Sequence, residues 1–428
     1  MNPSTATHWL ALPLLGLTLL LGGCSSSQFE LPEVEAAPLM VSDAGQARLW
    51  VLTKQEESRT VGVSSGGGRS SMRWRRDTLF HFQVQAFDPV TARPLWSRRL
   101  LTLGDHEAKG PGPSRVIGSS ADGRLLGQDG SVVWVLINKA PFAISAADGS
   151  LLADTAALEQ QNPELRGLLP TDAQHYAFDR GLVLLSADAR RFVIRGPGHE
   201  AVAYAPTPPP APPVDLMSNG RERIVPLMPM GEVPARLAQL DGQWLALYSD
   251  KEAADAANDS RGDNLRYPYR VLNEGALVRR SLWRPRVVSA QRFDDVFDRI
   301  ESLDPIAGAP SFLKGRFFKD LATGRPMAMA SPDGLMVWHS TRIDSAGRLA
   351  LSRLGNQLET VWSTPLPMSE SSTATPVMYW QLLDKVVVMG TLETMDDGVR
   401  SQEPHLASIN LADGKLQAWN ITREAVAP

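Results

Sequence analysis

Cysteine and histidine, the residue types most often used to bind metals or attack substrates, are few in this 428-residue chain. Cys24 is the only cysteine. The histidines are scattered, and none has a second possible ligand at the spacing of a known metal motif. They are His8, His81, His106, His175, His199, His339 and His405. Because no cluster of reactive side chains stands out, the sequence predicts no catalytic residue, no metal site, no cofactor and no enzymatic activity.

Cys24 itself lies in an unusual setting. It follows an apolar run over residues 9–21 and two glycines, and a tract of serines comes directly after it. The run is well short of the roughly twenty residues that a membrane-spanning helix needs. The string Leu21-Gly22-Gly23-Cys24 resembles the lipobox of exported bacterial lipoproteins.

The resemblance implies the fate of this cysteine. In such lipoproteins the peptide before the cysteine is removed, and the thiol and the new N-terminus carry acyl chains that together hold a protein firmly on a membrane. We therefore expect a signal peptide at residues 1–23, a lipidated flexible spacer at 24–46 and one folded domain at 47–428. Ser25 stands where an aspartate would signal inner-membrane retention, which implies the periplasmic face of the outer membrane.

The composition of the whole chain is that of an ordinary globular protein. Hydrophobic residues make up 43% of it and charged residues 21%. The formal net charge of −4 gives no general electrostatic reason to bind nucleic acid, and we expect no nucleic-acid partner. The 34 glycines and 32 prolines indicate many turns.

A strand-turn-strand unit recurs along the chain. Each copy has an alternating strand, a turn rich in Asp, Gly or Asn, and a return strand. The copies cover residues 82–96, 141–152, 349–362 and 405–419. Asp413-Gly414 is the clearest of the turns. Trp96, Trp362 and Trp419 end three of the copies, which predicts that their side chains fill the gaps between neighbouring sheets.

The spacing of the repeat predicts how the sheets are arranged. Trp362 and Trp419 are 57 residues apart, and a period of this size with several strands per unit favours a β-propeller. The hairpins resemble the repeats of quinoprotein-type propellers, whose outer strands end in a similar Asp-Gly hairpin with tryptophan. We predict an all-β fold with a single β-propeller of six blades, a seventh being left open, near residues 45–103, 114–158, 168–205, 222–290, 316–366 and 374–421.

Two further details of the propeller are expected. The strand at residues 49–53 is expected to complete the last blade and so to close the ring. One short inserted amphipathic helix is predicted over residues 291–304, where apolar residues fall mostly on one helical face: Phe293, Val296, Phe297, Ile300 and Leu303.

A glycine-rich and basic segment interrupts the first repeat. Residues 66–76 read Gly-Gly-Gly-Arg-Ser-Ser-Met-Arg-Trp-Arg-Arg. This composition fits either a loop that grips a phosphate or an anionic lipid headgroup, or a solvated hairpin loop without a ligand. The segment lacks the Gly-Lys-Ser/Thr ending of a P-loop.

Three functions fit a lipid anchor joined to a propeller. The layout is similar to that of outer-membrane-assembly lipoproteins, which implies a non-catalytic scaffold that binds one or more envelope proteins. A periplasmic sensor or binder of a small ligand or glycan in the propeller funnel is the first alternative. A quinoprotein-like oxidoreductase is the second, but the adjacent cysteine pair of that family is missing here. We predict the scaffold.

Overall fold

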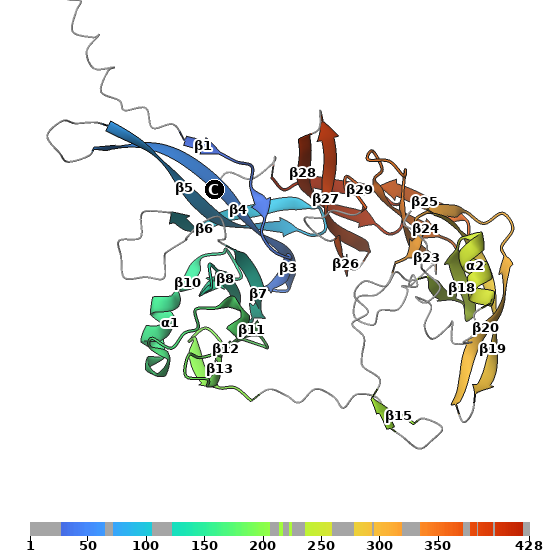
Figure 1. The fold of residues 1–428 in the computed structure, drawn as a ribbon, viewed down its shortest axis with the longest axis horizontal. Helices are drawn as coiled ribbons and strands as arrows, with labels where there is room; N and C mark the ends of the chain where they lie inside the picture. The colour runs from blue at the N-terminus through green and yellow to red at the C-terminus, as the bar shows by residue number, and fades with distance from the viewer. Residues whose placement is uncertain are drawn as a thin grey trace, which may run out of the picture.

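The computed structural model describes residues 27–64, 72–104, 122–205, 214–216, 222–224, 236–258, 278–292, 295–318, 334–370, 377–382, 384–396 and 399–422. Antiparallel sheets make up most of this part of the chain (Figure 1). Six of the sheets have four to six strands and follow one another along the sequence. The fold is therefore all-β and propeller-like, as predicted.

The first three sheets are blades 1 to 3. Blade 1 contains β1 (Ser27–Phe29), β2 (Glu33–Val34), β3 (Leu39–Asp43), β4 (Gln46–Ser64), β5 (Met72–Asp88) and β6 (Arg93–Gly104). Blade 2 contains β7 (Gly123–Asp129), β8 (Val132–Ile137), β9 (Ala140–Ser145) and β10 (Leu151–Ala153). Blade 3 contains β11 (Tyr176–Phe178), β12 (Leu182–Leu185), β13 (Arg191–Arg195) and β14 (Glu200–Ala203).

The last three sheets are blades 4 to 6. Blade 4 contains β17 (Leu237–Leu240), β18 (Gln243–Tyr248), β19 (Arg279–Arg292), β20 (Asp295–Pro305) and β21 (Ser311–Leu313). Blade 5 contains β22 (Arg316–Phe317), β23 (Leu335–Ser340), β24 (Leu349–Leu354) and β25 (Thr360–Pro365). Blade 6 contains β26 (Met378–Leu382), β27 (Lys385–Asp396), β28 (Val399–Asn410) and β29 (Leu416–Asn420).

Short elements connect the strands. Among the described residues, the α-helices are α1 (Thr155–Gln161), between blades 2 and 3, and α2 (Asp250–Ala257), between β18 and β19 of blade 4. The 3-10 helices η1 (Pro163–Leu165) and η2 (Ala173–His175) lie between blades 2 and 3. A separate small hairpin is formed by β15 (Val214–Leu216) and β16 (Glu222–Ile224). Helix α2 begins with a capping box, in which Ser249 and Glu252 each bond the other's backbone N–H.

Apolar clusters join the blades side by side. One cluster joins blades 1 and 2, another joins blades 2 and 3, and two more link blade 4 to blade 5 and blade 5 to blade 6. A further cluster joins blade 6 back to blade 1. Among the residues that the structure describes, no apolar cluster joins blade 3 to blade 4. The blades therefore follow an arc that runs from blade 3 through blades 2, 1, 6 and 5 to blade 4 (Figure 1).

The predicted way of closing the ring is wrong. Residues 49–53 lie inside β4, where they pair with β3, β2 and β5 of blade 1. Blades 6 and 1 meet through side chains instead, since Leu49 and Val51 pack in one cluster with Val387 and Met389. Because each blade keeps its own strands, this junction depends on packing and not on strand exchange.

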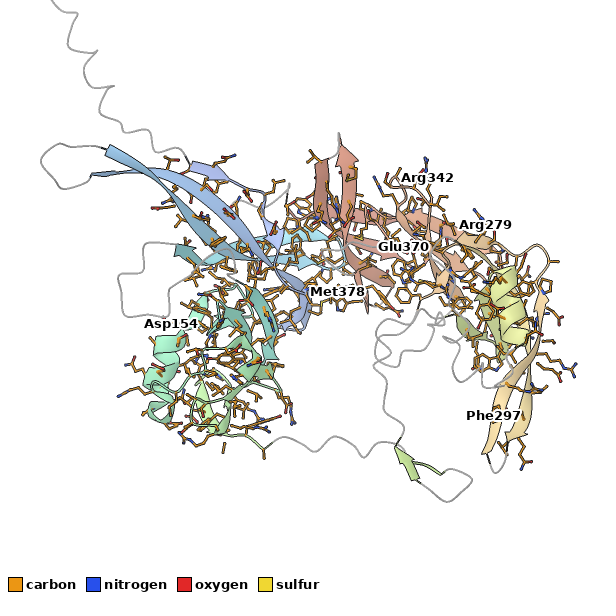
Figure 2. The ribbon with its side chains drawn as sticks, viewed as in Figure 1. Asp154, Arg279, Phe297, Arg342, Glu370 and Met378 are labelled. Atoms are coloured by element: carbon orange, nitrogen blue, oxygen red, sulfur yellow. The ribbon has the colours of Figure 1, made fainter. Side chains whose placement is uncertain are left out.

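The helix predicted over residues 291–304 is also wrong. This segment forms most of β20, which pairs with β19 from Trp283↔Pro305 to Arg292↔Asp295, and Phe297 lies on this projecting hairpin (Figure 2). Val296 is 67% exposed, whereas Ile300 is buried. Pairing with β19 satisfies the backbone polar groups of the segment, so a helical spacing of apolar residues did not decide its structure.

The N-terminal segment, residues 27–43, runs antiparallel along β4. Ser27 lies opposite Arg59, and Asp43 lies opposite Gln46. The sequence placed these residues in a flexible spacer, but their strands β1, β2 and β3 all pair with β4. Backbone hydrogen bonds fix them to the sheet, so within the flexible spacer expected over 24–46 residues 27–43 are part of blade 1 instead.

A buried polar cluster lies in blade 1, where β1 pairs with β4. The carboxylate of Glu57, only 2% exposed, accepts hydrogen bonds from Arg59 Nη2 at 3.0 Å and from His81 Nε2 at 2.8 Å. The hydrogen bond from Arg59 is the main reason why the pKa of Glu57 falls to about 2. The ring of Phe29 on β1 stacks on His81 with 6.1 Å between centroids. The charged cluster is thus covered and paired.

Tryptophans from three last strands meet turns of the next blade. A Cβ placed on Gly149 would lie 2.8 Å from Trp96, and one on Gly414 would lie 2.7 Å from Trp362. At the junction of blades 6 and 1, Trp419 belongs to the same apolar cluster as Ala92 in the β5–β6 turn. Each indole therefore lies at a blade junction, beside a turn that leaves room for it.

This contact makes the turn glycines sensitive to substitution. Gly414 has φ +71° and touches Trp362, whereas Gly130 has φ +58° with open space around it. We expect Gly414→Ala to lower the free energy of unfolding by about 2–5 kcal/mol and Gly130→Ala by about 1–2 kcal/mol, because only the first adds a clash to the backbone strain. Urea unfolding measures both, and equal losses would contradict the contact.

Candidate functional site

The lipobox residues Leu21, Gly22, Gly23 and Cys24 lie outside the described residues, which begin at Ser27. The other residues singled out by the repeat lie at blade junctions and turns. The Asp413 carboxylate accepts a hydrogen bond from the Lys415 backbone N–H at 3.1 Å, and this bond is the main reason why its pKa is lowered. The Asp413 carboxylate therefore stabilises the turn through this hydrogen bond.

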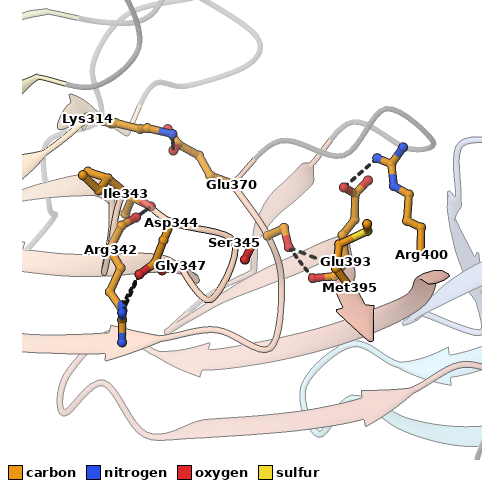
Figure 3. A pocket seen from close by; sticks show the side chains of 12 residues that line it. Lys314, Arg342, Ile343, Asp344, Ser345, Gly347, Glu370, Glu393, Met395 and Arg400 are labelled. Atoms are coloured by element: carbon orange, nitrogen blue, oxygen red, sulfur yellow. Dashed lines mark hydrogen bonds and ion pairs between the residues drawn. The ribbon is translucent and has the colours of Figure 1, made fainter. Parts of the chain in front are cut away.

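A groove opens at the junction of blades 5 and 6 (Figure 3). It encloses about 550 Å³. One wall is the loop between β23 and β24, and the other is the β27–β28 hairpin. Residues 369–370 after β25 lie between these walls, and Lys314 reaches the groove from the end of β21. Sequence reasoning missed the groove, because its residues come from three blades and share no motif.

Glu370 links blade 4 to blade 5 in the groove. Its carboxylate lies 2.7 Å from Lys314 Nζ and accepts a hydrogen bond from Arg316 Nη1 at 2.9 Å. The Glu370 side chain is 14% exposed, so water screens these ion pairs less than it would on an open surface. The carboxylate therefore holds the short connection between β21 and β22 in place.

Glu393 and Ser369 fix the wall formed by blade 6. Arg400 Nη2 donates to the Glu393 carboxylate at 2.6 Å across the β27–β28 hairpin. The backbone N–H of Glu393 donates to Ser369 Oγ at 3.0 Å, and the Ser369 N–H donates to the Thr391 carbonyl at 2.9 Å. The segment after β25 is thus hydrogen-bonded to β27 before any ligand binds.

The opposite wall, the loop between β23 and β24, is a compact turn. Asp344 forms an ion pair with Arg342, and its carboxylate accepts a hydrogen bond from the Ala346 N–H at 3.1 Å. The hydrogen bond from Arg342 is the main reason why the pKa of Asp344 is lowered. Ser340 Oγ donates to the Arg342 carbonyl at 2.9 Å. These bonds hold the loop in one shape.

Exposed apolar side chains stand at the edge of this charged groove. Ile343 is 61% exposed and Met395 is 61% exposed, and both line the groove. Val399, beside Arg400 near the end of the same hairpin, is 69% exposed. Protein interfaces combine apolar anchors, methionine and arginine in this way, with charged groups around them. The groove therefore combines exposed apolar side chains at its edge with paired charges in its walls.

A second hollow of about 360 Å³ lies on blade 3. The Tyr204 hydroxyl donates a hydrogen bond to the Asp179 carboxylate at 2.9 Å. This bond is the main cause of a raised pKa for Tyr204 and a lowered pKa for Asp179. The pair belongs to blade 3 alone, since Asp179 directly follows β11 and Tyr204 directly follows β14, the two outer strands of that sheet.

The described histidines lie in separate places. His81 bonds Glu57, His339 lies 2.8 Å from Ser352 Oγ, and His199 packs on Trp134. Burial lowers the pKa of both His199 and His339. In the part of the chain that the structure describes, no three metal-binding side chains gather around one point.

Comparison with known proteins leaves the function to be inferred from residues and geometry. No protein-family model matches the chain, and no curated protein is significantly similar to it. Within the described ranges, no helix has the length and apolar character needed to cross a membrane.

The partly buried position of Glu370, between two basic side chains, predicts a measurable loss of stability when its charge is removed. We expect Glu370→Gln to lower the free energy of unfolding by about 1–3 kcal/mol, because Lys314 and Arg316 lose a shared counter-charge. The control is Glu301→Gln, which removes the exposed pair with Arg286 and should cost less than about 0.5 kcal/mol. Chemical denaturation measures both variants. A Glu370→Gln loss no larger than that of the control would contradict this role.

Proposed function

We propose that this protein is a lipoprotein, anchored through Cys24 to the periplasmic face of the outer membrane, whose propeller is a non-catalytic scaffold for other envelope proteins. The lipobox Leu21-Gly22-Gly23-Cys24 supports the anchor. The observation that carries the scaffold role is the apolar edge of the groove, where Ile343 and Met395 stand exposed over paired charges.

The groove suits a protein segment because its walls are held in place beforehand. Hydrogen bonds fix the loop around Asp344 and the segment at Ser369, so a partner would not have to order them. The carboxylates of Asp344, Glu370 and Glu393 are all paired with basic groups. A partner could therefore bury Ile343 and Met395 without leaving an unpaired carboxylate in the interface.

The two alternative functions remain predictions with different requirements. A sensor or binder would hold a small ligand or glycan in the propeller funnel, and a quinoprotein-like oxidoreductase would hold a quinone. The exposed apolar edge of the groove favours a macromolecular partner over either small molecule, because small-molecule sites enclose most of the surface of their ligand.

The lipid anchor predicts that a single residue, Cys24, carries all of the acyl label. In a Gram-negative host supplied with radioactive palmitate, we expect the wild-type chain to be labelled and Cys24→Ser to be unlabelled. Ser25→Ala is the matched control and should keep the label. Ser25→Asp should keep it too but should move the protein to the inner-membrane fraction of a density gradient. Label on the Cys24→Ser protein would contradict the anchor.

The groove predicts a site-specific protein contact. A photo-crosslinking amino acid at Met395, activated in intact cells, should give one discrete adduct that Ile343→Asp reduces at least about tenfold, since about 1.4 kcal/mol of lost binding corresponds to that factor. The control position is Val202 on blade 3, which is 49% exposed. No adduct at Met395, or the same adduct from Val202, would contradict the groove as a partner site.

A further inference from the structure

We propose that the outer part of the β4–β5 hairpin, residues 60–64 and 72–76, is a second membrane contact that binds anionic phospholipid headgroups. The inference rests on the proposed lipid anchor, because the anchor decides which part of the propeller faces the bilayer. It deepens that proposal by naming the surface that meets the lipid.

The register of β1 places the anchor beside this hairpin. Ser27 pairs with Arg59 and Phe29 pairs with Glu57, so the N-terminal end of β1 points toward the far end of β4. Cys24 is three residues before Ser27. Three residues span at most about 10 Å, so a lipidated Cys24 brings the membrane surface close to the Arg59 end of blade 1.

The hairpin continues past that point. Its register runs from Arg59↔Asp77 to Ser64↔Met72, which is five further residue pairs. At about 3.4 Å per residue these pairs extend about 17 Å, more than the length of chain between Ser27 and Cys24. In Figure 1 the β4–β5 hairpin projects beyond the rest of blade 1, on the side where β1 begins. The outer residues therefore reach the headgroups whether the hairpin points toward the bilayer or lies along it.

The residue types in the outer part of the hairpin suit a membrane surface. Residues 60–64 and 72–76 contain Arg73, Arg75 and Arg76 together with Trp74, and they contain no aspartate or glutamate. Arginine is attracted by anionic headgroups, and tryptophan is enriched at membrane interfaces. This local charge is opposite to the formal net charge of −4 of the whole chain.

Exposed apolar side chains also stand on β1 and directly after it. Phe29 on β1 is 53% exposed, and Leu31, two residues further along the chain, is 59% exposed. The nearest buried carboxylate, Glu57, is 2% exposed and paired with Arg59, so it does not present an unpaired negative charge to the headgroups. Exposed apolar groups beside basic residues are typical of proteins that lie on a bilayer.

The test uses the mature chain from Ser25 to Pro428 without lipid, which keeps every described strand. Its sedimentation is measured with vesicles of phosphatidylcholine alone and with vesicles of equal parts phosphatidylcholine and phosphatidylglycerol. The variant replaces Arg73, Arg75 and Arg76 with glutamine. The matched control replaces Arg93, Arg98 and Arg99, three exposed arginines at the other end of the same blade. Thermal unfolding checks that both variants remain folded.

We expect binding to the phosphatidylglycerol vesicles only, weakened by salt. Each basic residue near an anionic surface strengthens binding by about fivefold, so the hairpin variant should bind about a hundredfold more weakly while the control binds like the parent. Binding that is unchanged in the hairpin variant, equally lost in the control, or displaced by inorganic phosphate at matched ionic strength would overturn the proposal. Because the tested chain carries no lipid, these outcomes do not depend on whether Cys24 is acylated.

Discussion

The arrangement of this protein depends on tryptophan side chains that lie between one blade and a turn of the next. Trp96 lies against the turn at Gly149, and Trp362 lies against the turn at Gly414 and donates a hydrogen bond from its indole to the Leu411 carbonyl at 3.1 Å. At both of these turns the residue that faces the ring is a glycine, which has no Cβ, so the ring lies close to the backbone. At the junction of blade 6 and blade 1, Trp419 packs in one apolar cluster with Ala92 of the β5–β6 turn.

The repeated packing of a tryptophan against a turn explains why the blades could be predicted from the sequence. A strand, a tight turn and a tryptophan lie within about fifteen residues of one another, so the repeat was visible and each predicted blade segment overlaps one of the six blades. The strand β20 of blade 4 was not predicted. It is held by its pairing with β19, and the spacing of apolar residues in 291–304 does not reveal that pairing. Long-range pairing decided that segment.

The groove could not be predicted for a related reason. Lys314, Glu370 and Glu393 are far apart in the sequence, and only the packing of blades 4, 5 and 6 brings them to one place. The N-terminal segment shows the opposite case, in which a flexible spacer was expected after Cys24 but pairing along β4 fixes residues 27–43 to the sheet. Its consequence for function is that a lipid on Cys24 would be joined to blade 1 by a very short link. The orientation of the scaffold on the membrane would then be restricted.

Intact-mass spectrometry of the protein extracted from cell membranes is the decisive test of the lipid anchor, because it reads the start of the mature chain and its modification together. An anchor at Cys24 predicts a chain that begins at Cys24 and carries added acyl mass on that residue. A chain that begins at Met1, or that begins after Cys24 without acyl mass, would contradict it.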